Sequence, residues 1–426
     1  MKKSGVFFFA LLAAALLFAK PGRAEWTGLH GFAEQAFGLR LNDDKLTKRK
    51  TYNMLEQRLQ LKSSYVFSQG PLSRWQGFFQ WKGDFTLDEY FGEKTDFELR
   101  EAFLNLNPEP FLDMKVGRQV LTWGTGDYLF INDVFPKDYV SFYIGRDDEY
   151  LKKPSDALRL SFYPQPANVD IVISRFAPND MPEGDRLSFF DPFQGQIAGR
   201  TVDRVLLEPS RQAENLEYAG RIYRNFASTE AALYVFRGFD KIARSYKNEA
   251  LRQLYYERQD VFGASLRGPF GGGVASVEGA YVRSPEDPHG DNRLIENSMV
   301  KLMAGYEKDL GGDLKIGFQY YYEQKLDYGA YARSLQPGDF LWDEHRHLLT
   351  QRLTKLFKGQ TVAVSLFNFY SPSDHDGYLR LSVSYDLSDR WKLVAGANLP
   401  WGEDDWTEFG QMKKNKNIYF RARLSF

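Results

Sequence analysis

The last ten residues, "NIYFRARLSF" (417–426), alternate strictly between two kinds of side chain. One set is apolar and the other is polar or charged: Ile418, Phe420, Ala422, Leu424 and Phe426 against Asn417, Tyr419, Arg421, Arg423 and Ser425. Successive side chains of a β-strand point to opposite faces, so this segment predicts a strand with one apolar face and one charged face. Such a strand suits a wall that separates lipid from water.

The same alternation recurs along the chain in about eighteen segments. They lie near 26–40, 51–67, 73–85, 96–106, 112–122, 156–163, 168–176, 212–226, 228–239, 256–268, 272–284, 297–308, 313–325, 344–357, 360–371, 377–387, 390–399 and 415–426. Most of them match the roughly 9–11 residues that a tilted strand needs to cross a bilayer. A soluble β-sandwich is the alternative, but soluble strands average only about 5–6 residues.

The connections between these segments alternate between short and long. Short ones such as "SQGPL" (68–72), "LGGD" (310–313) and "LSDR" (387–390) carry the Gly, Pro and Asp of tight turns, whereas the longest lie near 123–155 and 177–211. Outer-membrane barrels have short periplasmic turns and long extracellular loops. We therefore expect an all-β fold, a transmembrane antiparallel β-barrel of about 18 strands, over residues 25–426.

Residues 1–24 have the pattern of a secretory signal peptide. Lys2 and Lys3 precede an apolar run over 6–19, and Gly22 and Ala24 are small residues at the spacing that signal peptidase requires. We expect cleavage after Ala24 and export to the outer membrane of a Gram-negative cell. An uncleaved membrane anchor is the alternative, although the apolar run is short for a spanning helix.

Composition excludes several classes of function. The chain has no cysteine, which excludes disulfides, thiolate metal sites, a cysteine nucleophile and a lipoprotein anchor. The formal net charge of -1 gives no reason to expect nucleic acid as a partner. The mean hydropathy of -0.47 argues against a helical membrane protein.

Basic side chains dominate the face that we expect to line the lumen. They are Arg58, Lys62, Arg74, Lys82, Arg100, Arg221, Lys315, Arg380, Lys392, Arg421 and Arg423, against the acids Glu56, Asp84, Glu98, Glu217, Glu323 and Asp386. Basic rings favour anions in a pore. The alternative is a self-neutralising ladder of ion pairs that fills the lumen, and the sequence leaves both open.

The rhythm of strands breaks after the segment at 112–122. The stretch "WGTGDYLFINDVFPKDY" (123–139) begins with Trp123, expected at the outer aromatic girdle, and continues with the glycine-rich "GTGD". This stretch does not lead from a strand into a helix, so it lacks the context of a phosphate-binding loop. The loop of about 33 residues that follows is apolar and aromatic. We expect it to fold inward and narrow the pore, with Lys137, Arg146 and Lys152 as solute contacts.

Two stretches resemble known outer-membrane proteins. The residues Gly117-Arg118-Gln119, Trp123-Gly124, Asp133-Val134, Pro136 and Asp138, followed by Asp148, Lys153 and Pro154, resemble a motif of the alginate-export-like porins and of a related porin-like family. The resemblance implies a barrel and a channel, and it implies no catalytic residue. The final strand, which ends in Phe426, resembles the signal by which the barrel-assembly machinery recognises its substrates.

These features predict a porin-like outer-membrane channel for diffusion or export of small polar solutes, preferentially anionic ones, through a loop-constricted lumen. Its partners would be outer-membrane lipid and the solute, as a monomer or an oligomer, with no nucleic acid, cofactor or metal. The protein would not be an enzyme. A barrel sheath or adhesin for a protein partner is the alternative, and an outer-membrane hydrolase is weaker. Acidic clusters in the long loops, such as Asp147-Asp148-Glu149, are expected to be solvated surface charge.

Overall fold

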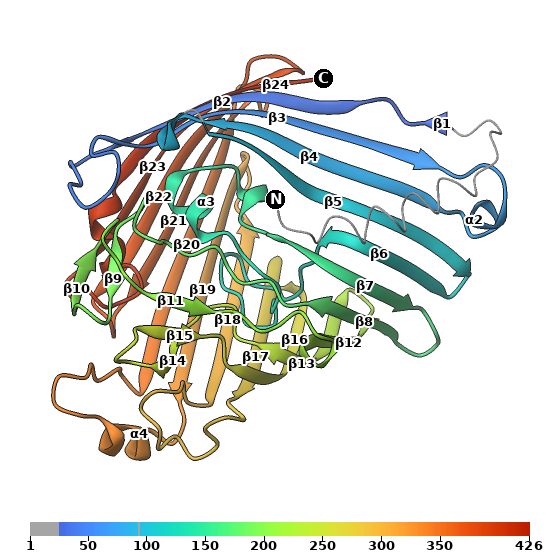
Figure 1. Cartoon of the computed structure of the whole chain (residues 1–426). Coiled ribbons are helices and arrows are strands. Elements are labelled where there is room, and N and C mark those ends of the chain that lie inside the picture. The colour runs from blue at the N-terminus through green and yellow to red at the C-terminus, as the bar shows by residue number, and fades with distance from the viewer. Residues whose placement is uncertain (1–24, 93) are drawn as a thin grey trace.

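The C-terminal strand β24 (Asn417–Ser425) pairs with β2 (His30–Arg40) near the start of the chain. Beyond the ladder, Phe426 and Gly31 exchange two backbone hydrogen bonds of 3.0 Å. This pairing closes the sheet into a ring, as the computed structural model shows for residues 25–92 and 94–426 (Figure 1). The predicted signal peptide, residues 1–24, lies outside the described residues.

Eighteen antiparallel strands form the ring, and this confirms the predicted fold class. The other sixteen are β3 (Tyr52–Val66), β4 (Phe78–Asp88), β5 (Lys94–Glu109), β6 (Leu112–Val120), β7 (Pro154–Phe162), β8 (Asn168–Arg175), β12 (Leu216–Phe226), β13 (Thr229–Phe239), β16 (Arg258–Phe270), β17 (Gly273–Arg283), β18 (Met299–Asp309), β19 (Leu314–Lys325), β20 (His345–Phe357), β21 (Val362–Ser371), β22 (Asp376–Asp386) and β23 (Trp391–Gly402). Each pairs with its neighbours in the chain.

Short elements lie in the connections. The strands are β1 (Glu25–Trp26), β9 (Phe189–Asp191), β10 (Gln196–Ala198), β11 (Val205–Leu207), β14 (Ser245–Asn248) and β15 (Gln253–Tyr255). The α-helices are α2 (Pro71–Arg74), α3 (Tyr139–Ile144) and α4 (Tyr328–Ser334), and the 3-10 helices are η1 (Glu89–Phe91), η2 (Asp148–Tyr150), η3 (Ala213–Asn215) and η4 (Gly410–Asn415). None of the helices in the described part of the chain has the length and apolar character needed to span a membrane.

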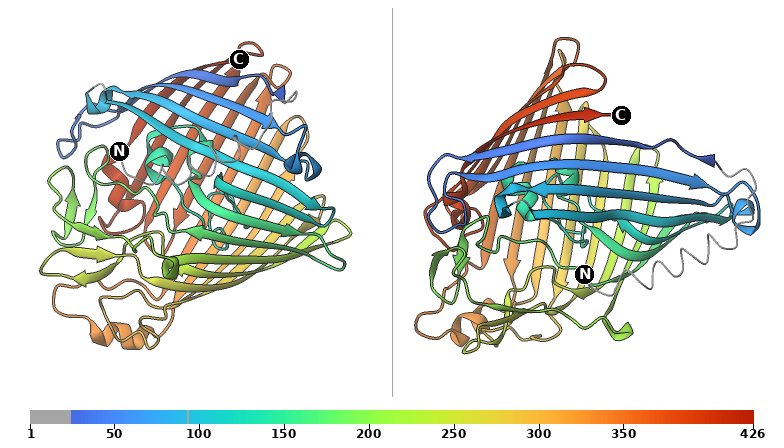
Figure 2. Two further views of the ribbon diagram at one scale, coloured as in Figure 1. Left: turned by 45° about the vertical axis from the view of Figure 1, so that its right-hand side comes forward. Right: turned by 45° about the horizontal axis from the view of Figure 1, so that its top comes forward.

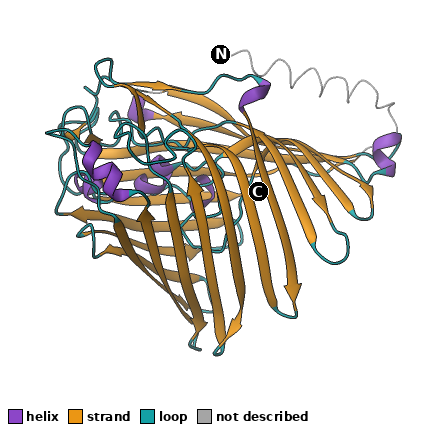
Figure 3. Ribbon diagram, turned by 90° about the horizontal axis from the view of Figure 1, so that it is seen from below, coloured by secondary structure: helices purple, strands orange, loops and turns teal. Residues whose placement is uncertain are grey.

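The two ends of the barrel differ in the length of their connections (Figure 3). At one end the strands are joined by connections as short as 227–228 and 271–272. At the other end, segments such as 121–153 and 176–215 join them. Both chain ends of the sheet lie at the short-turn end, since β2 begins there and β24 ends there. This is the alternation that the sequence predicts.

One short connection is longer than predicted. Residues 67–77 form a turn that includes α2, because Gly70 adopts a φ of 82° before Pro71 and the amide of Gly77 donates to the carbonyl oxygen of Leu72 at 2.8 Å. Strand β4 therefore begins at Phe78 and not near residue 73. Arg74 lies in α2 at the short-turn end, so its predicted place on the inward face of a strand is wrong.

The outward face of the ring is apolar. Leu233, Phe262, Leu302 and Phe318 point away from the lumen, and Leu233 is 61% exposed. Monomeric soluble proteins rarely expose apolar surface of this extent, so the belt is the surface that contacts lipid. The charged residues of β24 lie on the inward face instead, where Arg421 is buried.

The hydrophobic core lies inside the ring. Its members come from the inward faces of the strands and from the segment 121–153: Phe236, Val261, Met303, Leu348, Phe367, Phe369, Tyr378 and Tyr419 from the strands, and Leu129, Ile131, Phe135, Phe142, Tyr143, Ile144 and Leu151 from the segment. A barrel of eighteen strands is too wide for wall side chains alone to fill. The segment therefore supplies the other half of the core.

The two faces of a strand predict opposite responses to a charge. Leu381 is exposed on the outward face at the middle of β22, and Ser382 faces inward beside it. We expect Leu381→Arg to lower the free energy of folding into vesicles by about 2–4 kcal/mol, the cost of a cation at the bilayer midplane. Ser382→Arg is the matched control and should cost less, as measured by urea titration of vesicle-folded protein. Equal losses would contradict the assignment of faces.

Candidate functional site

The segment between β6 and β7, residues 121–153, lies inside the ring of strands, and we name it the lumen loop (Figure 2). Its root is at β6 and β7, where Val120 pairs with Pro154. Its side chains contact inward-facing residues of β17, β20, β21, β22, β24 and β3. Since β20 and β21 lie opposite β6 and β7 in the strand order, the loop crosses the lumen.

The glycine-rich turn at the start of the loop binds a carboxylate that belongs to the protein itself. Glu278 of β17 is 1% exposed and accepts hydrogen bonds from the amide and hydroxyl of Thr125 at 2.6 and 2.8 Å. The amide and side chain of Asn132 donate to its other oxygen at 2.8 and 3.1 Å. Gly124 has a φ of 82°, and a Cβ there would lie 2.9 Å from Glu278. A glycine is therefore required where the loop meets this carboxylate.

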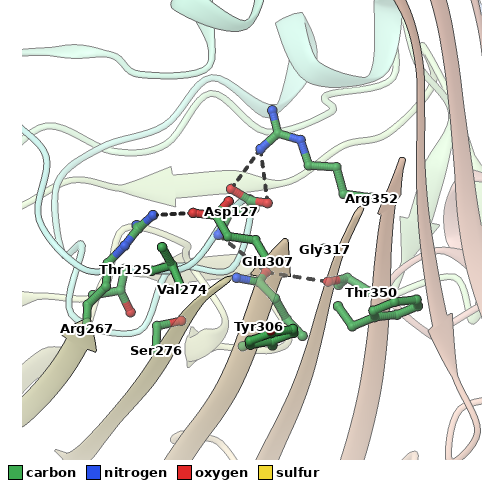
Figure 4. Close-up of a pocket in the computed structure, with 13 residues that line it drawn as sticks. Thr125, Asp127, Arg267, Val274, Ser276, Tyr306, Glu307, Gly317, Thr350 and Arg352 are labelled. Atoms are coloured by element: carbon green, nitrogen blue, oxygen red, sulfur yellow. Dashed lines mark hydrogen bonds and ion pairs between the residues drawn. The ribbon is translucent and has the colours of Figure 1, made fainter. Parts of the chain in front are cut away.

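The tip of the turn is tied to the wall beyond Glu278. Arg352 of β20 donates to both carboxylate oxygens of Asp127 at 3.1 and 3.2 Å, and Gln319 of β19 accepts from the amide of Asp127 at 3.3 Å. A small pocket of about 30 Å³ lies beside these contacts and is bordered by the ion pair of Arg267 with Glu307 (Figure 4).

Aromatic side chains hold the middle of the loop against β21 and β22. Tyr128 packs edge to face on Phe367 with ring centroids 4.8 Å apart, and Phe142 packs on Tyr378 at 5.4 Å. Phe142 belongs to α3, whose first turn is capped by the Asp138 carboxylate, which accepts from the Ser141 amide at 2.8 Å. Such aromatic pairs add about 0.5–1.5 kcal/mol each beyond the area they bury.

The acidic run Asp147-Asp148-Glu149 lies against the basic face of the barrel, so its predicted place as solvated external charge is wrong. Asp147 pairs with Arg421 at 2.9 Å and with Arg423 at 3.1 Å. Burial alone would raise the pKa of Asp147, but these two guanidinium groups outweigh burial and lower it. Asp148 pairs with Arg380 at 2.9 Å.

The same run reaches β4 and β5. Glu149 pairs with Lys82 at 2.9 Å, and the guanidinium of Arg100 donates to the carbonyl oxygens of Glu149 and Lys152 at 3.2 and 2.9 Å. Arg58 and Arg100 both lie over the ring of Tyr150, at 4.2 and 4.6 Å from its centroid. Four predicted lumen cations on β22, β24 and β4 therefore pair with acids of the loop.

Loop cations also bind wall acids. Arg146 donates to both oxygens of Glu56 on β3, at 2.9 and 2.5 Å. Glu56 also pairs with Arg58 at 3.5 Å, and Arg58 with Asp84 at 2.7 Å. This network lies beside the acidic run, so the inward face near the loop is a ladder of ion pairs. The ladder is the alternative that the sequence left open.

Two further loop cations do not stand free in the lumen. Lys137 is 2% exposed, pairs with Asp133 at 3.0 Å and donates to the carbonyl oxygen of Phe135. Its predicted role as a solute contact is therefore wrong. Lys152 donates to the hydroxyl of Thr122 at 2.9 Å.

The remaining predicted cations lie on the inward face away from the acidic run. Arg221 pairs with Glu230 at 2.5 Å, and Lys392 pairs with Asp386 at 3.3 Å. Lys62 and Lys315 are exposed, and no ion pair involves them among the described residues. Lys315 and Lys392 lie at the short-turn ends of β19 and β23.

A cavity of about 340 Å³ lies between the lumen loop and β5. Its lining alternates in charge: Asp96, Glu98, Arg100, Arg118, Asp138, Arg146, Tyr150, Lys153 and Asp180. Arg100 is buried, and its Nε has no hydrogen-bond partner within the described part of the chain. Space with this polar lining is suited to water and small polar solutes.

Sequence reasoning missed Glu278 and Asp127, and it misplaced Trp123. Glu278 was not singled out because an isolated acid on a strand has no local signal; its partners are more than 140 residues away in the chain. Trp123 does not lie in the outer girdle, because its ring packs on Phe135 and on Tyr234 inside the barrel. Across residues 25–92 and 94–426, no three His, Asp or Glu side chains are grouped to hold a metal ion.

Removing the Glu278 charge should release the start of the loop. Glu278→Gln keeps the size of the side chain but points amide hydrogens at donors of Thr125 or Asn132. We expect a loss of about 1–3 kcal/mol in the free energy of folding, the cost of unsatisfied buried groups, and a larger, noisier single-channel current. Glu307→Gln, at the half-exposed pair with Arg267, is the control. Identical currents in both variants would contradict the anchoring role.

No protein-family model matches the chain, and no curated protein matches it. The resemblance of residues 117–154 to alginate-export-like porins therefore remains a prediction. Among solved structures, the chain is similar to OccD3 (OpdP) of Pseudomonas aeruginosa, with a TM-score of 0.54, 9% identity and 96% of each chain covered. It is also similar to OccK5 (OpdH) of the same organism, with a TM-score of 0.53, 12% identity, and 93% of this chain and 96% of that chain covered. The chain thus has the fold of outer-membrane barrels.

Proposed function

We propose that the protein is a porin-like channel of a Gram-negative outer membrane, through which small polar solutes diffuse past the lumen loop. The observation that carries this proposal is the position of the loop: it crosses a barrel whose interior is otherwise too wide for side chains to fill. The loop is attached at Glu278, Arg352, Arg380 and Arg421, so it narrows the lumen as a fixed element.

The space left beside the loop suits small solutes. The cavity of about 340 Å³ next to β5 is at the lower end of the size of small-molecule sites. Charged side chains of both signs line it, so a solute there exchanges water for polar partners. A folded protein would not enter this lumen without displacing the loop, which counts against the sheath alternative.

An anion preference would arise at the short-turn end. The loop acids cover Arg380, Arg421 and Arg423, whereas Lys62 and Lys315 are exposed and carry no ion pair among the described residues. Exposed cations at a pore mouth raise the local concentration of anions. The preference is therefore expected to be weak in the intact channel.

Deleting residues 126–150 tests the constriction and the charge argument together. We expect planar-bilayer conductance to increase severalfold. The reversal potential in a salt gradient should shift further toward anions, because the deletion uncovers Arg380, Arg421 and Arg423. Deletion of 328–334, the α4 segment at the long-loop end (Figure 1), is the control.

An unchanged conductance in the 126–150 deletion would contradict the constriction. Cation selectivity of the intact protein would contradict the anion preference and leave the channel itself standing. If protein that is folded in the bilayer gives no conductance at all, the proposed function is overturned.

A further inference from the structure

Three arginines lie on the outward face of neighbouring strands, all at the long-loop end. Arg175 and Arg283 are the last residues of β8 and β17, and Arg237 is two residues from the end of β13. We name these three residues the arginine rim. They span the five adjacent strands from β8 to β17.

The alternation of each strand places these side chains toward lipid. Arg237 follows the outward-facing Leu233 and Val235 at every second residue, and Arg283 follows Val277 and Tyr281 in the same way. Arg237 is 76% exposed and Arg283 is 49% exposed. Cations are thus held at the long-loop edge of the apolar outward face.

Acidic partners do not neutralise the rim. Asp260 of β16 lies between Arg237 and Arg283 in the ladder and contacts both, at the long distances of 3.8 and 3.6 Å. Arg175 has no ion pair within residues 25–92 and 94–426. One carboxylate therefore faces three guanidinium groups.

On other strands, the outward face at the long-loop end carries aromatic side chains instead of arginines. On β19 and β20, Tyr320 and Tyr322 bond to His347 and His345 at 2.7 and 2.9 Å, and Tyr370 of β21 stacks near Trp401 of β23. Aromatic belts of this kind anchor a barrel at the membrane interface without a specific headgroup. The edge from β8 to β17 carries arginines instead.

We propose that the arginine rim binds the phosphate groups of outer-leaflet glycolipid, with Arg237 and Arg283 as its centre. The proposal rests on the proposed outer-membrane location, with the long loops outside. A guanidinium matches a phosphate with two parallel hydrogen bonds, and Asp260 holds two such groups on either side of one carboxylate. The apolar side chains below them on the same strands would contact the acyl chains.

The test measures lipid binding to purified, delipidated full-length protein by native mass spectrometry in a non-ionic detergent. The probes are diphosphorylated lipid A, the same lipid with its phosphates removed, and inorganic phosphate. The variants are Arg237→Gln with Arg283→Gln, and the control Arg224→Gln, which removes an exposed outward arginine near the short-turn end of β12.

We expect the double variant to bind diphosphorylated lipid A at least about tenfold more weakly than the unaltered protein, and the control to stay within about twofold. Dephosphorylated lipid should bind equally weakly to all three proteins. Equal affinity of the double variant and the control would overturn the proposal. Competition by millimolar inorganic phosphate alone would overturn it in favour of a free-anion site, and loss of self-association without loss of lipid would overturn it in favour of a contact between copies.

Heat-modifiable migration of each variant shows that the barrel is folded, so weak binding is not the result of unfolding. The readout does not depend on conductance. A failed lipid test with normal conductance leaves the proposed channel intact, and normal lipid binding without conductance leaves the rim intact.

Discussion

The pairing of β24 with β2 is the contact on which the rest of the molecule depends. Backbone groups in hydrocarbon have no water to bond, so a sheet that spans lipid must have no open edge. The paired amides of Phe426 and Gly31 extend that closure to the last residue. Closure by eighteen strands then fixes a lumen that side chains of the wall do not fill. The need to fill this space gives the lumen loop its structural role.

The lumen loop solves a packing problem and an electrostatic problem together. Its aromatic residues complete a core with Phe367 and Tyr378, and its acids pair with the wall arginines Arg380 and Arg421. Its glycine-rich turn, which resembles an anion-binding loop in sequence, does bind an anion. That anion is the carboxylate of Glu278 on the facing wall.

The period of two in the sequence predicts the strands and their faces well, because lipid imposes one chemistry on one face along the whole strand. Residues 417–426 show this most clearly. Arg74 was misplaced because Gly70 and Pro71 start a helical turn that alternation does not reveal. The partners of the lumen cations were not predictable, since the pairing of Asp147 with Arg421 joins residues 274 apart in the chain. Alternation determines which face a residue lies on, and tertiary contact determines what it meets there.

The position of the lumen loop can be measured directly, because the chain has no cysteine. Asp148→Cys with Arg380→Cys places two thiols where an ion pair of 2.9 Å joins loop and wall. A short bifunctional thiol reagent should add once per molecule, bridge the two sites and hold the conductance low. Asp148→Cys with Arg237→Cys, whose second thiol faces lipid, should take up two separate adducts. Two separate adducts on the first pair as well would contradict a loop that crosses the lumen.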